Sequence, residues 1–115
     1  MFLPQSDIRK IQQIMQDKPV KAIYLFGSYA RGQADKNSDV DLLVEFDYNE
    51  LNKKYDYFDI KYDLENNLRK KVDLISAKKL LMSKIATLVE RDKILIYETP
   101  KSEKTDTQAG DSLGG

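Results

Sequence analysis

Two apolar segments of this chain meet small or acidic residues at their ends, and this arrangement limits the folds available to it. Residues 20–26 form an apolar run that predicts a buried strand, and this run stops abruptly at Gly27 and Ser28. Ten residues separate Ser28 from the acidic pair Asp39 and Asp41, which opens a second apolar run. The sequence therefore predicts two strands, with a tight turn after the first and two carboxylates at the start of the second.

The acidic pair indicates a site for a hard cation. Residues two apart in a strand share a face and lie roughly 6.5–7 Å apart at Cα, so Asp39 and Asp41 point the same way. Two negative charges about 6 Å apart repel by roughly 3 kcal/mol at an effective dielectric constant of about 20. The chain contains no His and no Cys, and oxygen ligands suit magnesium or manganese rather than zinc. Taken alone, the pair is equally compatible with a solvated strand end.

The turn between the two strands has the features of a phosphate-binding loop. Gly27 permits a tight turn and a close approach of the backbone to a ligand. We expect Ser28 to cap a short helical segment at residues 29–31, whose free N–H groups would suit a phosphate. Arg31 adds a positive charge nearby. An ordinary strand-to-helix turn would explain Gly27 and Ser28 alone, but their spacing from the acidic pair favours chemistry on a nucleoside triphosphate.

The stretch from Gly27 to Asp41 resembles the signature of the DNA polymerase β-like nucleotidyltransferase superfamily. A resemblance to the minimal nucleotidyltransferase (MNT) family, which includes antitoxins paired with HEPN-domain toxins, is carried by Ala30-Arg31-Gly32, Ala34, Ser38 and Leu42-Leu43-Val44. It covers most of residues 1–98. It implies an α/β (α+β) fold: one small nucleotidyltransferase domain, with a mixed sheet of about four strands flanked by helices.

The resemblance also implies a third carboxylate on a later strand. Asp73, within the apolar run at residues 72–75, matches it. The alternative is that Asp73 pairs with one of the basic residues that precede it, which are Arg69, Lys70 and Lys71.

Roles for these residues follow from the resemblance. It implies that Asp39, Asp41 and Asp73 ligate two Mg²⁺ ions, with Mn²⁺ as an alternative, and that Asp73 either ligates the second ion or accepts the acceptor's proton. Gly27 and Ser28 would bind the β- and γ-phosphates. For Arg31 two roles remain open: it neutralises the leaving pyrophosphate, or it pairs with an acid such as Asp35.

The implied reaction transfers a nucleoside monophosphate to an acceptor and releases pyrophosphate. In the MNT family the donor is ATP and the acceptor is a tyrosine hydroxyl of a HEPN-domain ribonuclease toxin, which the added AMP silences. Three other interpretations remain: an aminoglycoside-modifying type of small-molecule nucleotidyltransferase acting as a homodimer, a non-catalytic antitoxin that acts by binding alone, and a plain α/β domain with coincidental acids.

The composition of the chain limits the classes of partner and substrate that we expect for it. The 115 residues suffice for one domain, and 19 basic residues balance 19 acidic ones. This balance argues against nucleic acid as the main substrate. No apolar run approaches the roughly 20 residues that cross a membrane, so we expect no membrane partner and a cytoplasmic location. Both a homo-oligomer and a hetero-oligomer fit the sequence.

Helical periodicity predicts three longer helices. The first spans about residues 7–17, capped by Ser6, with an inward face of Ile8, Ile11 and Met15. The second spans about residues 50–69 and carries two apolar stripes, one of Tyr57, Ile60, Leu64 and Leu68 and one of Leu51, Tyr55, Phe58 and Tyr62. The second stripe would be either core or a partner surface.

The C-terminal part predicts a helix, a strand and a tail. The helix spans about residues 77–91 and buries Leu81, Ile85, Leu88 and Val89. A last short strand follows at residues 93–97. Residues 99–115 are polar and glycine-containing, and we expect a disordered tail after a single domain at residues 1–98.

Overall fold

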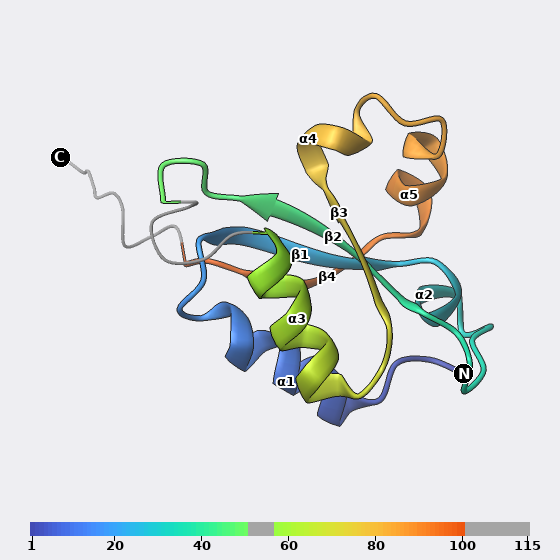
Figure 1. Cartoon of the computed structure of the whole chain (residues 1–115). Coiled ribbons are helices and arrows are strands. Elements are labelled where there is room, and N and C mark those ends of the chain that lie inside the picture. Colours follow the sequence, from blue (N-terminus) through green and yellow to red (C-terminus); the bar gives the residue numbers. More distant parts are fainter. Residues whose placement is uncertain (51–56, 101–115) are drawn as a thin grey trace, which may run out of the picture.

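The computed structural model describes residues 1–50 and 57–100 of the chain, and these form four strands and five helices (Figure 1). In chain order the elements are α1 (Gln5–Met15), β1 (Val20–Phe26), α2 (Ser28–Arg31), β2 (Val40–Phe46), α3 (Tyr57–Leu68), β3 (Val72–Ser76), α4 (Ala77–Leu80), α5 (Ala86–Asp92) and β4 (Ile94–Glu98). No helix in the described ranges is both long and apolar enough to cross a membrane.

The four strands form one mixed sheet in the order β3-β2-β1-β4. Strand β1 runs antiparallel to both β2 and β4, whereas β2 and β3 are parallel. The prediction of a mixed four-stranded α/β (α+β) domain is confirmed. The strands form where apolar and β-branched residues are concentrated, so the predicted bounds agree within one residue at each end.

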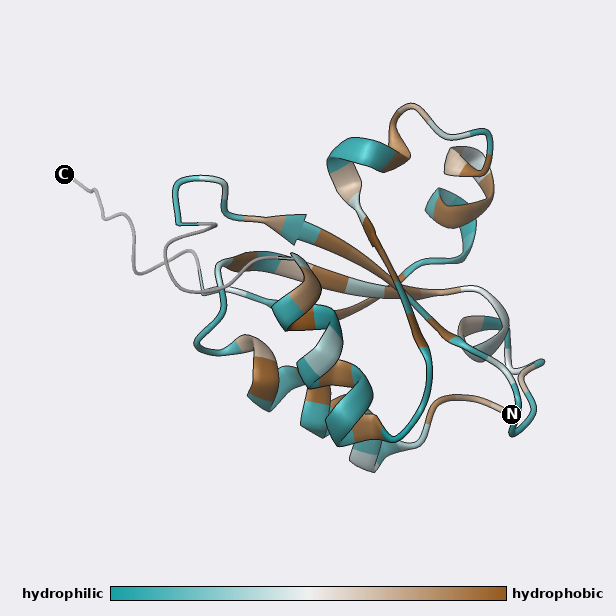
Figure 2. Cartoon of the chain, viewed as in Figure 1, coloured by the Kyte–Doolittle hydropathy of each residue, from teal (hydrophilic) through white to brown (hydrophobic). Residues whose placement is uncertain are grey.

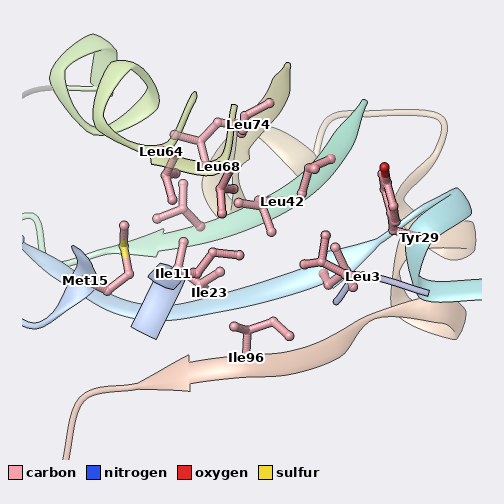
Figure 3. Packing of buried hydrophobic residues seen from close by; sticks show 14 of the residues in the cluster. Leu3, Ile11, Met15, Ile23, Tyr29, Leu42, Leu64, Leu68, Leu74 and Ile96 are labelled. Atoms are coloured by element: carbon pink, nitrogen blue, oxygen red, sulfur yellow. The ribbon is translucent and has the colours of Figure 1, made fainter. Parts of the chain in front are cut away.

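Helices α1 and α3 cover one face of the sheet and form the larger core (Figures 1 and 3). Ile11 and Met15 of α1 are fully buried, as are Ile60 and Leu64 of α3. Each such side chain contributes roughly 1.5–3 kcal/mol when it leaves water. A partly buried ion pair joins the N-terminal helix to the loop before β3: Lys70 Nζ lies 2.8 Å from Asp7 Oδ2. The larger core therefore fixes β2 and β3 side by side.

The opposite face of the sheet carries a smaller core beneath α4 and α5 (Figure 1). It contains Phe26, Leu43, Leu80 and Val89. The predicted single helix at residues 77–91 is wrong, because the chain turns between α4 and α5. Of its four predicted inward residues only Val89 is buried, while the others are exposed: Leu81, Ile85 and Leu88.

Local hydrogen bonds account for this turn. The Ser76 side chain caps α4 by accepting from the Lys79 N–H, and the Leu80 carbonyl accepts from the Ser83 N–H. The Ser83 hydroxyl then accepts from the Ile85 N–H before α5 begins. These hydrogen bonds turn the chain where the apolar pattern predicts one continuous helix. Figure 2 shows the hydropathy of the residues in this connection.

The remaining helix predictions need smaller corrections. Helix α1 begins at Gln5, after Pro4, so Ser6 lies inside the helix and does not cap it. Residues 51–56 of the second predicted helix, including Leu51 and Tyr55, lie outside the described residues, as do residues 101–115 of the predicted tail. On α3, Phe58 and Tyr62 are exposed, so the described part of the second stripe is not core.

Candidate active site

The three candidate carboxylates meet near one end of the sheet. Asp41 lies in the central strand β2, where its register partners are Phe26 on β1 and Asp73 on β3. Neighbouring strands lie about 4.8 Å apart, so Asp41 and Asp73 stand side by side. Asp39 precedes β2 by one residue and shares the orientation of Asp41. The structure therefore brings Asp39, Asp41 and Asp73 together.

These carboxylates lie on the face of the sheet that α4 and α5 cover. Leu42 belongs to the larger core, whereas Leu43 belongs to the smaller one. Because side chains alternate along a strand, Asp41 shares the face of Leu43. Ile75 packs against the same smaller core, and it places Asp73 on that face as well.

Gly27 brings the turn into contact with the acidic pair. Its φ of 75° and ψ of −156° lie in a region that only glycine adopts without strain. A Cβ atom built at this position would lie 2.0 Å from the Asp41 Oδ2 atom. The backbone of the turn and the Asp41 carboxylate therefore touch, which links the two halves of the sequence signature in space.

Ser28 occupies a different position from the one predicted. It is the first residue of α2, and Gly27 takes the cap position without a side-chain hydrogen bond. The expectation that Ser28 caps the helix is wrong, because the helix begins one residue earlier than predicted, at Ser28 itself. The Gly27 carbonyl accepts from the N–H groups of Ala30 and Arg31. The hydroxyl of Ser28 thus lies at the start of the short helix, beside the turn.

The Asp41 carboxyl is held in an environment that disfavours its charge. Burial raises its pKa, and the neighbouring charges of Asp73 and Asp39 raise it further, to about 6. The positive charge of Arg31 opposes this rise in pKa. A cation bound among these carboxylates would remove the repulsion that raises the pKa.

Arg31 pairs with an acid that the sequence did not indicate. Its guanidinium lies 3.1 Å from Asp92 Oδ2 at the end of α5, and its Nε donates to Gln33 Oε1 at 3.1 Å. Asp35, the predicted alternative partner of Arg31, instead accepts a hydrogen bond from the Asn37 N–H. The alternative for Asp73 also weakens, because Lys70 bonds to Asp7 instead. The Arg31–Asp92 ion pair joins the end of α5 to the short helix after the Gly27 turn.

The loop before Asp39 is fixed by hydrogen bonds that the sequence analysis did not predict. The buried Tyr29 hydroxyl donates to the Asp35 carbonyl at 3.3 Å, and the Asp35 N–H donates to Ser38 Oγ at 2.9 Å. The Asp35 carboxylate accepts from the Asn37 N–H at 2.8 Å. A side chain that bonds to the backbone two residues on is typical of an Asx turn, and this local signal is readable from the sequence.

The donor set fits magnesium with a phosphate ligand. Within residues 1–50 and 57–100, no three His, Cys, Asp or Glu side chains enclose a common point as a ready cage for a metal ion. Magnesium is usually bound through one or two carboxylates together with substrate phosphates and water, so it needs no such cage. Asp39, Asp41 and Asp73 offer only oxygen, and the pKa of Asp41 is raised by burial and, to a smaller extent, by the charges of Asp73 and Asp39. A tight glycine turn against paired carboxylates is the arrangement expected of a nucleotidyltransferase.

Comparison with known proteins agrees with this class. The family described as polymerase β nucleotidyltransferase matches residues 9–102, and the chain belongs to that family. A relative from Methanocaldococcus jannaschii, named provisionally as protein adenylyltransferase MJ1379, is 43% identical over 91 residues, which cover 78% of this chain and 89% of the relative. Protein adenylyltransferase MntA from Thermococcus cleftensis is 39% identical over 67% of this chain and 75% of its own length.

Solved structures share the fold. A structure described provisionally as a minimal nucleotidyltransferase has a TM-score of 0.61 at 28% identity, over 78% of this chain and 89% of that one. A toxin–antitoxin crystal structure with AMP-PNP has a TM-score of 0.59 at 24% identity, over 84% of this chain and 77% of that one. At the latter identity the likeness concerns the fold.

Proposed function

We propose that this protein transfers AMP from ATP to a tyrosine hydroxyl of a HEPN-type ribonuclease toxin and thereby acts as its antitoxin. The contact of the Gly27 turn with Asp41, beside Asp73, carries the proposal, because it joins a phosphate site to a carboxylate group. Two relatives are named as protein adenylyltransferases, and these names support ATP as the donor and a protein as the acceptor. One structure of similar fold contains a tri-AMPylated HEPN toxin in complex with an MNT antitoxin.

The β1 side of the site would bind the triphosphate. The Ser28 hydroxyl and the first N–H groups of α2 would meet the β- and γ-phosphates, because early helical N–H groups lack partners within their helix. Gly27, which lacks a side chain, leaves room for the Asp41 carboxylate against the backbone of the turn. Arg31, held in place by Asp92, would balance the charge of the leaving pyrophosphate.

The three carboxylates would bind metal and prepare the acceptor. Asp39 and Asp41 would hold two Mg²⁺ ions, with Mn²⁺ as an alternative, and Asp73 would hold the second ion or take the acceptor's proton. When bound, such ions stabilise the attacking and leaving oxygens and lower the pKa of the attacking hydroxyl. Asp73 lies next to Asp41 in register, so both carboxylates would be able to act on one reacting group.

The proposed step is an in-line displacement at the α-phosphorus of ATP. The acceptor oxygen forms a bond to phosphorus while the bond from phosphorus to the bridging oxygen of pyrophosphate breaks. The acceptor proton passes to Asp73 or to water, and the charge on pyrophosphate is met by Arg31 and by the N–H groups of α2. The products are an AMP-modified hydroxyl and pyrophosphate.

The test uses the purified chain with Mg²⁺, ATP labelled at the α-phosphate, and lysate of the source organism. We expect label to enter one protein with wild-type chain and not with the Asp39→Asn/Asp41→Asn variant. A tyrosine-linked adenylate in that protein, found by mass spectrometry, would establish the acceptor. Label that enters only small molecules would favour the small-molecule enzyme, and neutralisation of a toxin by the double variant would favour binding alone.

A further inference from the structure

The segment that runs from α4 into α5, residues 77–88, leaves large apolar side chains in water (Figure 1). Four of them are between 42% and 90% exposed: Leu81, Met82, Ile85 and Leu88. Burying one such side chain completely stabilises a protein or a complex by roughly 1.5–3 kcal/mol. Single exposed apolar residues are common on protein surfaces, whereas a group of them marks a surface that binds another molecule.

The same segment is positively charged. Residues 77–88 contain no acid and three lysines: Lys78, Lys79 and Lys84. In the part of the chain that the structure describes, none of these lysines forms an ion pair. By contrast, the next acid along α5, Glu90, pairs with Lys93 at 3.0 Å. The segment therefore offers free positive charges between exposed apolar side chains, which suits an acidic and apolar partner.

A recess of about 460 Å³ lies beside this segment. Lys78 and Leu81 line it from the segment, while Tyr24 and Leu43 line it from the sheet. Tyr48 also lines the recess, and its ring centre lies 5.0 Å from the Lys78 ammonium. A recess of this kind suits a side chain that projects from a protein, which the flat surface of a lipid bilayer does not supply.

The segment lies close to the carboxylate site. Leu80 belongs to the smaller core together with Phe26 and Leu43. Phe26 is the register partner of Asp41, and Leu43 follows Asp41 by two residues, which is roughly 6.5–7 Å at Cα. A protein interface of standard size buries about 800 Å² on each partner, so it extends well beyond this distance. One bound protein can therefore contact the segment and also reach the carboxylates.

We propose that residues 77–88 are the docking surface for the protein that receives AMP, and that they bind an acidic, apolar segment of it. The inference rests on the proposed function and adds the surface that recognises the partner. A protein held there has a high local concentration beside the carboxylates, so its reacting hydroxyl needs few contacts of its own. A small acceptor that does not reach the segment gains nothing from it.

Binding is tested first without catalysis. The ¹⁵N-labelled full chain is titrated with a short peptide built from Glu and Leu, and separately with the same peptide carrying Lys in place of Glu. We expect the acidic peptide to shift the NMR amide signals of residues 77–88 and the basic peptide to leave them unchanged. Equal effects of the two peptides, or no shift in this segment with the acidic one, would overturn the proposal.

Catalysis is then tested with matched variants. Lys84→Glu and Leu81→Ser change the segment, whereas Lys10→Glu and Tyr62→Ser change exposed residues of α1 and α3, which cover the opposite face of the sheet. The acceptors are the protein that takes the label from α-labelled ATP, purified from the lysate, and N-acetyl-tyrosinamide.

We expect each variant of the segment to raise the KM for the protein acceptor about tenfold, equivalent to about 1.4 kcal/mol. The KM for ATP and the transfer to N-acetyl-tyrosinamide should stay unchanged, and the two control variants should behave as wild type. A loss that is equal for the protein and the small acceptor would overturn the proposal, because a docking surface acts on the protein alone.

Other occupants of the surface give different results. Dimers of the chain in sedimentation experiments that Leu81→Ser abolishes would assign the surface to a second copy and overturn the proposal. Binding to phosphatidylglycerol vesicles that Lys84→Glu abolishes would assign it to a membrane, with the same consequence.

The proposed function and the docking surface fail differently. If the wild type transfers AMP to no acceptor, the proposed function fails, while the peptide titration still decides whether residues 77–88 bind an acidic, apolar segment. If the wild type transfers AMP but Lys84→Glu and Leu81→Ser match the control variants, the function stands and the docking surface is assigned wrongly.

Discussion

Gly27, which follows the end of β1, is in direct contact with Asp41, which lies near the start of β2. A Cβ atom at position 27 would lie 2.0 Å from Asp41 Oδ2 and 2.9 Å from Asp41 Cγ. The turn at Gly27 can therefore lie against the Asp41 carboxylate only while position 27 lacks a side chain. This contact couples the shape of the turn to the placement of the proposed metal ligand.

Gly27→Ala should lower transfer at least a hundredfold, because the new methyl group displaces the Asp41 carboxylate. The strained backbone region should also cost about 1–3 kcal/mol of folding stability. Transfer rates and urea unfolding measure both effects. Gly32→Ala is the matched control: its φ is 77°, yet its Cβ would meet the exposed Phe2 ring instead of Asp41. Equal loss of transfer in both variants would show that strain alone is responsible.

Asp41→Asn should stabilise the metal-free protein at neutral pH. The folded-state pKa of Asp41 is raised to about 6, so the folded protein binds more protons than the unfolded chain between about pH 4 and 6. Stability from this group is therefore present at low pH and is lost as the pH rises through 6. After allowance for partial exposure, we expect a gain of about 1 kcal/mol at pH 7 and none at pH 4. A gain of the same size at both values would contradict the assigned pKa.

Asp92→Asn should weaken the use of ATP with little effect on folding. The pair of Arg31 and Asp92 is partly exposed, and such surface pairs contribute little to stability because water screens them. Without it, Arg31 loses its fixed position beside the turn, and the KM for ATP should rise several-fold while the KM for the acceptor stays constant. Asp17→Asn, which removes the exposed partner of Lys18 far from the site, is the control. An unchanged KM for ATP in Asp92→Asn would remove Arg31 from the nucleotide site.

Leu80 and Leu81 should differ sharply in their importance for stability. Leu80 is 3% exposed within the smaller core, whereas Leu81 is 82% exposed. Leu80→Ala should cost about 2–4 kcal/mol, and Leu81→Ala less than about 0.5 kcal/mol. Thermal or urea unfolding of the two variants gives the comparison. A large loss of stability in Leu81→Ala would instead support the single helix at residues 77–91 that the apolar pattern predicts.

The sequence reveals local features of this protein well. Strands β1 and β2 and the grouping of Asp39 with Asp41 follow from apolar runs and from the two-residue period of a strand. Asp73 was assigned through family resemblance, and the parallel pairing of β2 with β3 gives it a physical position beside Asp41.

Other features depend on contacts between residues distant in the chain. Arg31 meets Asp92 across 61 positions, and no local pattern indicates this pair. Leu81, Ile85 and Leu88 follow a helical period, but the sheet face beneath them is already filled by Leu80 and Val89. The aromatic residues Tyr48 and Phe58 carry no signal of their own until the fold brings them to one cleft.

The most direct test of the central claim compares ATP labelled at the α-phosphate with ATP labelled at the γ-phosphate. Both are incubated with the purified chain, Mg²⁺ and a tyrosine-bearing acceptor, with the Asp39→Asn/Asp41→Asn variant in parallel. We predict that only the α-label enters the acceptor, that the γ-label leaves as pyrophosphate, and that the variant transfers neither. Entry of the γ-label, or undiminished transfer by the variant, would contradict nucleotidyl transfer at these carboxylates.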